Sequence, residues 1–114
     1  MKKIFLLLFL FSVHLKAQPT LTKVEPFLEN LIAELPSVRD VAMNKKGDEI
    51  YMTVQGYQGE LSTIVQSTLI NGKWNPINIA SFSGKYDDLE PFLSHDELRL
   101  YFVSNRPTNI TADT

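Results

Sequence analysis

The chain of 114 residues contains no cysteine. A disulfide framework is therefore excluded, although an exported chain could have used one. A bacterial lipoprotein anchor is excluded as well, because it needs a cysteine directly after the signal sequence. Basic clusters are also absent and the formal net charge is −2. Since phosphate neutralisation supplies most of the affinity for nucleic acid, we expect no nucleic-acid partner.

Two lysines and an apolar run open the chain, as MKKIFLLLFLFSVHLKAQ. The run from Ile4 to Val13 is shorter than the roughly 20 residues that a bilayer-spanning helix needs. This pattern predicts a secretory signal peptide over residues 1–17, with cleavage after Ala17. Cleavage would remove three lysines and no acid, which takes the net charge from −2 to −5. We therefore expect an exported protein, periplasmic or extracellular, whose mature chain has no transmembrane anchor.

A helical pattern follows in the N-terminal segment, residues 18–37. Its apolar residues recur at intervals of three and four between Val24 and Leu35. Pro26 suits the first turn of a helix and Pro36 its end. The pattern predicts a short helix that packs against the body of the protein.

From Val38 onward the apolar period is two. The stretches EIYMTVQ (49–55) and LRLYFVS (98–104) carry apolar residues on both alternating sets, which predicts strands that are buried on both faces. Asn71-Gly72 is a strong signal for a two-residue β-hairpin. Pro76 then makes the second strand of that hairpin an outer one, because proline cannot donate to a central ladder.

Two segments of this region are similar without gaps. DVAMNKKGDEIYMTV (40–54) and EPFLSHDELRLYFVS (90–104) align at an offset of 50 residues. Each contains an acid, a short apolar strand, a polar turn and an alternating strand with a tyrosine. A period of roughly 40–50 residues with all-strand content is typical of β-propeller blades. The repeat copies span about 39–55 and 88–106.

The second copy, in the stretch DDLEPFLSHDELRLYFVSNRP (87–107), resembles the Pro-Asp variant of the WD-like repeat found in TolB-type β-propellers. Glu97 stands where that repeat has glycine. The first copy keeps Gly47 but has Val41 for the proline and Lys46 for the aspartate. NGKWNPINI (71–79) is similar to the Gly-x-Trp segment that closes a blade in exported propellers. The matching positions of the second copy are Asp88, Glu90, Pro91, Phe92, Ser94, Asp96, Leu100, Tyr101, Phe102, Ser104, Asn105 and Arg106.

The resemblance implies an all-β fold in which residues 38–114 form an antiparallel, incomplete β-propeller of about two blades. The proline fixes φ beside the entering strand, and the serine and aspartate bond backbone groups in the turn. A closed propeller takes about four to eight blades, so we expect the remaining blades beyond Thr114. Without them we expect the segment to be poorly stable, or to associate through its open sheet face and unpaired edge. Structural roles in the repeat are expected for Asp88, Pro91, Ser94, Asp96, Tyr101 and Phe102.

Two groups of side chains invite a chemical interpretation. The consecutive Ser94-His95-Asp96 has the residue types of a catalytic triad, but triad members converge from separate positions whereas turn neighbours diverge. Asp87, Asp88 and Glu90 have carboxylates that suit Ca²⁺, but they lack the spacing of a calcium loop. We expect turn chemistry at the first group, and no catalytic residue, metal or other cofactor.

Five residues are candidates for recognition because they lie at strand ends, where propellers expose a rim or a channel: Arg39, Asp40, Glu90, Asn105 and Arg106. The alternative is that Arg106 and the acids pair with one another or with the backbone. We expect Trp74 to pack within a blade rather than to stack on a sugar. The glycosylation sequon Asn109-Ile110-Thr111 is of a kind that occurs often by chance.

The leading functional hypothesis is an exported β-propeller scaffold that binds a protein or small ligand in the cell envelope and is not an enzyme. One alternative is the propeller portion of a secreted hydrolase or polysaccharide lyase whose catalytic residues lie beyond this chain. Another is a linker joined to a peptidoglycan-binding domain. Sequence beyond Thr114 would separate them, because a nucleophile elbow or a histidine cluster favours the enzyme and further bare repeats favour the scaffold.

Overall fold

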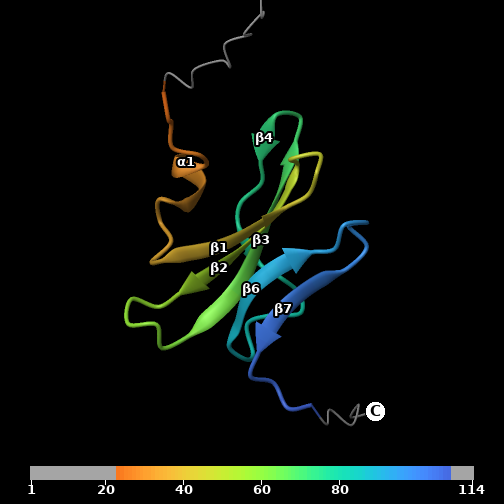
Figure 1. Ribbon diagram of the computed structural model, residues 1–114. Coiled ribbons are helices and arrows are strands. Elements are labelled where there is room, and N and C mark those ends of the chain that lie inside the picture. Colours follow the sequence, from red (N-terminus) through yellow and green to blue (C-terminus); the bar gives the residue numbers. More distant parts are fainter. Residues whose placement is uncertain (1–22, 109–114) are drawn as a thin grey trace, which may run out of the picture.

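The computed structural model of the chain describes residues 23–108 (Figure 1). They form mostly antiparallel β structure, arranged as a five-stranded and a two-stranded sheet. The signal peptide predicted over 1–17 and the sequon at Asn109 lie outside the described residues. Among the residues that are described, no helix is long and apolar enough to cross a membrane.

The N-terminal segment contains one short helix, α1 (Glu29–Ile32). The helix predicted between Val24 and Leu35 was therefore too long. Leu28 adopts a left-handed conformation with φ of 60°, from which an L-residue cannot continue a right-handed helix. The predicted packing is confirmed, because the side chains of Leu28, Ile32 and Leu35 lie against the buried core of the first sheet.

The five-stranded sheet has its long strands in chain order. They are β1 (Val38–Met43), β2 (Glu49–Gln55) and β3 (Ser62–Ile70), and each pairs antiparallel with the next. Two short strands complete the sheet, β4 (Lys73–Trp74) and β5 (Asn78–Ile79), both paired with β3.

The hairpin predicted at Asn71-Gly72 is confirmed. The two residues have φ of 52° and 75°, as a type I′ turn requires, and the pair Ile70–Lys73 closes it. Pro76 lies between β4 and β5, so the outer strand is broken where proline offers no N–H group.

The second sheet is the hairpin of β6 (Asp88–Leu93) and β7 (Leu100–Ser104). In Figure 1 it lies in front of the first sheet, and β6 contacts β1, β2 and β3. The strands β6 and β2 are also joined by a hydrogen bond, in which the Glu90 amide donates to Thr53 Oγ1 at 3.0 Å. Thr53 is fully buried.

The hairpins β1–β2 and β6–β7 share one backbone geometry, 50 residues apart. Asp40 and Glu90 have positive φ of 49° and 57°, and at each of them the strand pairing slips by a bulge. The open ends of the two hairpins are also closed by equivalent hydrogen bonds. The Gln55 amide donates to the Ser37 carbonyl, and 50 residues later the Asn105 amide donates to the Asp87 carbonyl.

The turns of the two hairpins match in the same way. The Asn44 amide donates to the Glu49 carbonyl, and the Ser94 amide donates to the Arg99 carbonyl. Gly47 has φ of 75° and Glu97 has φ of 60°, so Glu97 takes the left-handed conformation of the glycine that it replaces. Glycine adopts this conformation without steric cost, whereas glutamate does not.

The central strand β2 is buried on both faces, as predicted. Ile50, Met52 and Val54 form the core of one face together with Val65 of β3. That face is covered by the N-terminal segment and by Trp74, so the expected packing role of Trp74 is confirmed. The opposite face carries Thr53, which lies against β6.

The prediction that β7 is buried on both faces was wrong. Phe102 is half-buried and its ring stacks on Phe82 with centroids 5.0 Å apart. On the other face Tyr101 is 53% exposed and Val103 is 52% exposed. Alternation alone could not reveal this, because burial of the second face needs another layer, and none covers it among residues 23–108.

Candidate functional site

The five residues that the sequence proposed for recognition fall into two groups. Arg39, Asp40 and Glu90 form the first, at the two bulges. Arg39 Nε lies 2.8 Å from Asp40 Oδ2 and its Nη2 lies 3.7 Å from Glu90 Oε1. Although the first pair is close, its N–H does not point at the oxygen, because the buried Asp40 Oδ2 accepts no hydrogen bond from any described residue. Arg39 thus links the two bulges electrostatically on a partly exposed surface.

Arg106 belongs to the second group and has internal partners. Its Nη2 donates to Asp88 Oδ1 at 2.8 Å and to the Phe82 carbonyl at 3.0 Å. Asp88 is fully buried, and its Oδ2 accepts a hydrogen bond of 2.7 Å from Ser83 Oγ. Arg106 therefore pairs with an acid and with the backbone, which is the alternative to a recognition role that the sequence left open.

The pKa of Asp88 reflects these contacts. Burial alone would raise it, because a charge is costly away from water. Hydrogen bonds from Ser104, Arg106 and Ser83, together with the positive charge of Arg106, outweigh burial and lower the pKa below its ordinary value. The carboxylate is thus held ionised inside the protein.

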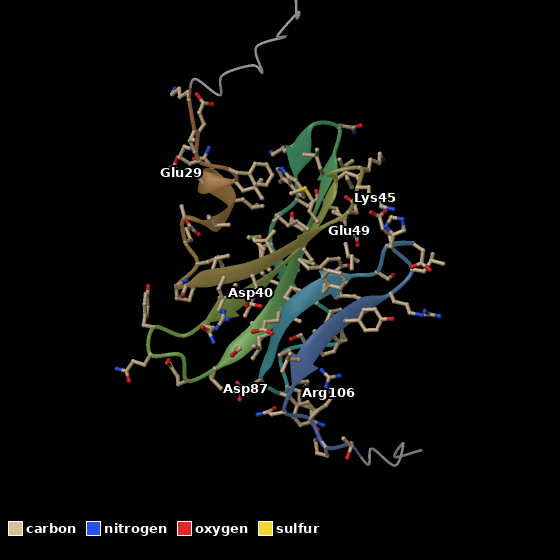
Figure 2. All side chains as sticks on the ribbon, in the orientation of Figure 1. Glu29, Asp40, Lys45, Glu49, Asp87 and Arg106 are labelled. Atoms are coloured by element: carbon tan, nitrogen blue, oxygen red, sulfur yellow. The ribbon has the colours of Figure 1, made fainter. Side chains whose placement is uncertain are left out.

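Asn105 completes a junction between the two sheets. Its Nδ2 donates to Asp87 Oδ2 at 2.9 Å, and its Oδ1 accepts from the Asp87 amide at 3.0 Å. Asp87 Oδ1 in turn accepts from the Ser62 amide, at the start of β3. Figure 2 shows Asp87 and Arg106 at the same end of the β6–β7 hairpin. The carboxylates of Asp87 and Asp88 therefore both have a structural role.

A cleft of about 460 Å³ opens beside this junction, where β2 runs into the loop before β3. Its wall is mainly apolar, and the exposed Leu61 and Ile79 contribute to it. Lys85 and Tyr86 add an ammonium group and a ring, 5.5 Å apart from Nζ to ring centroid. The lining residues are Pro36, Val54, Gln55, Gly56, Glu60, Leu61, Ser62, Thr63, Ile79, Gly84, Lys85, Tyr86, Asp87 and Asn105.

Gly84 shapes the cleft. Its φ is 94°, and a Cβ placed there would lie 3.1 Å from the side chain of Ile79. Any larger residue would strain the backbone and push against Ile79. The connection into β6 can therefore pass close to β5 only with glycine at this position.

Sequence reasoning found only part of this cleft. Asn105 was proposed for recognition, but Leu61, Lys85 and Tyr86 were not, because they lie in loops and match no motif. A usable signal was the run Lys85-Tyr86-Asp87, in which an aromatic residue stands between opposite charges directly before a strand.

The group Ser94-His95-Asp96 forms a turn, as expected. Ser94 Oγ donates to Asp96 Oδ1 at 2.5 Å, so the imidazole of His95 does not lie between them. The same hydroxyl accepts from the Arg99 amide, and Asp96 Oδ1 accepts from the Leu98 amide. The hydrogen bonds from Ser94 and the Leu98 amide lower the pKa of Asp96. These atoms therefore stabilise the turn.

No group of three or more histidine, cysteine or acidic side chains within residues 23–108 is placed to hold a metal ion. Comparison of the chain with protein-family models, with curated proteins and with solved structures finds no match.

Proposed function

We propose that the chain is part of an exported β-propeller that serves as a binding scaffold in the cell envelope and has no catalytic role of its own. The observation that supports this proposal best is the shared geometry of the two hairpins, with the bulge, the turn and the closing hydrogen bond recurring after 50 residues. The second hairpin also lies on the face of the first sheet. Repeated antiparallel sheets that pack face to face are the construction of a propeller.

The cleft beside Tyr86 is the proposed binding site. Its junction residues Asp87 and Asn105 already satisfy each other's hydrogen-bonding groups, so they fix the wall. Leu61 and Ile79 remain exposed, and Lys85 Nζ makes no ion pair with a described residue. Ligand sites combine an apolar wall with a few polar groups that orient the ligand. The chemistry suits a partner segment that carries an apolar or aromatic side chain next to a carboxylate.

A titration followed by amide NMR shifts tests this site. The probes are two acetylated tetrapeptide amides, each with one phenylalanine and either one aspartate or one lysine. We expect the aspartate peptide to shift the amides of Gly84, Lys85 and Tyr86 more strongly than the lysine peptide does. Shifts that are absent, scattered over the surface or larger with the lysine peptide would contradict the proposal.

A pair of variants provides the control. Leu61→Asp places a negative charge on the cleft wall and should abolish the shifts caused by the aspartate peptide. Ile70→Asp makes the same change at a comparably exposed residue near the Asn71-Gly72 turn, and it should leave the titration unchanged. Equal effects of the two variants would exclude the cleft as the site.

A further inference from the structure

The turn Asn71-Gly72, at the tip of the β3–β4 hairpin, brings an asparagine side chain next to an unhindered peptide nitrogen. Both residues are exposed, and Gly72 has open space where a side chain would stand. Nothing therefore blocks an approach of the Gly72 nitrogen to the side-chain carbonyl carbon of Asn71. Asparagine is one of the thermolabile residues of proteins.

The side chain of Asn71 is also less restrained than those of other turn asparagines. Asn44 Oδ1 accepts two backbone hydrogen bonds within its own turn, and both ends of the Asn105 amide bond to Asp87. No residue between 23 and 108 makes a hydrogen bond to the side chain of Asn71, although Asn75 and Asn78 nearby each have one. The carboxamide of Asn71 is therefore free to rotate toward the next peptide nitrogen.

These two groups support deamidation through a cyclic imide. The nitrogen of Gly72 forms a bond to Asn71 Cγ, and the side-chain nitrogen leaves as ammonia with the proton that the Gly72 amide gives up. Water then opens the ring at one of its two carbonyl groups. Opening at Cγ leaves aspartate in an unchanged main chain. Opening at the main-chain carbonyl leaves isoaspartate, in which the main chain runs through Cβ and Cγ and is one atom longer.

The closed turn opposes this reaction, and the short strand after it permits it. In a type I′ turn the first central residue has ψ of about +30°, which directs the next nitrogen away from that residue's own Cβ. Ring closure therefore requires the turn to open. β4 has two residues, held in register with β3 by the pairs Ile70–Lys73 and Leu69–Trp74. A strand end with so few pairs opens at a lower free energy than the core strands do.

We infer that Asn71 is a site of spontaneous deamidation whose isoaspartate product detaches β4 from β3. The hairpin has a two-residue loop of fixed geometry, so the additional main-chain atom prevents the two strands from pairing in register. Trp74, which packs against the core, then loses its place. The aspartate product has no such effect, because Asp-Gly forms the same type I′ turn. Neither step involves the proposed cleft.

Peptide mapping of the aged full chain tests the modification. After incubation at neutral and at mildly alkaline pH, trypsin releases peptide 47–73, in which Asn71 is the only asparagine, and peptide 74–85, in which no asparagine precedes glycine. We expect peptide 47–73 to gain about 1 Da and to separate into two species on chromatography. The gain should be faster at alkaline pH, because the attacking nitrogen must lose its proton. Peptide 74–85 should keep its mass.

Two variants of Asn71 provide the controls. Asn71→Gly keeps the turn, because Gly-Gly also forms type I′, but it has no carboxamide, so its peptide 47–73 should keep its mass. Asn71→Asp reproduces the ordinary product. Trp74 is the only tryptophan, so its fluorescence reports the detachment of β4. We expect the emission to move to longer wavelength as isoaspartate accumulates in the wild type, and to be unchanged in freshly prepared Asn71→Asp.

The two parts of the proposal can fail separately. If peptide 47–73 of the aged wild type gains no more mass than that of Asn71→Gly, Asn71 is not a deamidation site. If isoaspartate accumulates without a change in Trp74 emission, the product does not detach β4. Far-ultraviolet circular dichroism shows whether Asn71→Gly keeps its strands. If it does not, peptide 74–85 of the wild type still serves as the control.

Discussion

At the residue scale, the two hairpins share unusual backbone conformations at equivalent residues. Asp40, Glu90 and Glu97 are all non-glycine residues with positive φ. Such conformations are costly for L-residues and persist only where the surroundings impose them. Two of the three occur at the same place in each bulge, and the third occupies a place that is glycine in the first hairpin.

This likeness predicts opposite effects of two substitutions. Gly47→Ala should lower the free energy of unfolding by about 1 kcal/mol, because alanine pays the left-handed penalty. Glu97→Gly should raise it by somewhat less, since it relieves that penalty but loses the exposed contact between the Lys45 amide and the Glu97 carboxylate. Urea unfolding measures both changes. A neutral Gly47→Ala variant together with a destabilised Glu97→Gly variant would contradict the assigned turn geometry.

At the element scale, the positions of the strands could be predicted from the sequence. Which of their faces other elements would cover could not be predicted. The period of two located β2 and β7, and Asn71-Gly72 located the hairpin, because local backbone preferences decide these features. The helix prediction failed at Leu28, because nothing in the local sequence indicates the left-handed φ of this residue. The bulges at Asp40 and Glu90 were also missed.

The candidate site, too, was predictable from the sequence only in part. Arg39, Asp40 and Glu90 were chosen only as strand-end residues, and the structure brings the three together at the bulges. Arg106 and Asn105 were chosen as strand-end residues, yet their contacts are internal. The cleft depends on two loops far apart in sequence, around Leu61 and Tyr86, and no local pattern joins such loops.

The ion pair between β6 and the segment after β7 makes stability depend on pH. The folded pKa of Asp88 lies below the ordinary value that it has in the unfolded chain. The stabilising effect of the ion pair is therefore complete above that ordinary value and disappears as the pH falls through the folded pKa. Asp88→Asn should destabilise the protein clearly at pH 7, because it leaves Arg106 without its charged partner.

The gap between wild type and Asp88→Asn should therefore narrow near pH 3. Urea unfolding of the two proteins at both pH values measures the gap directly, and the subtraction removes the contributions of the other acids. A gap that stays constant from pH 7 to pH 3 would show that Asp88 is not held ionised by Arg106.

At the scale of the whole molecule, two equivalent β hairpin units stack through their faces. The stack depends on contacts between elements far apart in the chain, above all β6 against β1, β2 and β3. Proteins of this size usually unfold in one step when such contacts are extensive. The two sheets should then be a single cooperative unit and not two independent ones.

The most direct test is native-state amide hydrogen exchange at Glu90, followed by NMR. Its N–H donates to Thr53 Oγ1 across the two sheets, so it is protected only while the hairpin lies on the first sheet. We predict that it exchanges with the same opening free energy as the buried amide of Met52 in β2, and that Thr53→Val accelerates it selectively. Fast exchange at Glu90 beside slow exchange at Met52 would contradict the stacked arrangement.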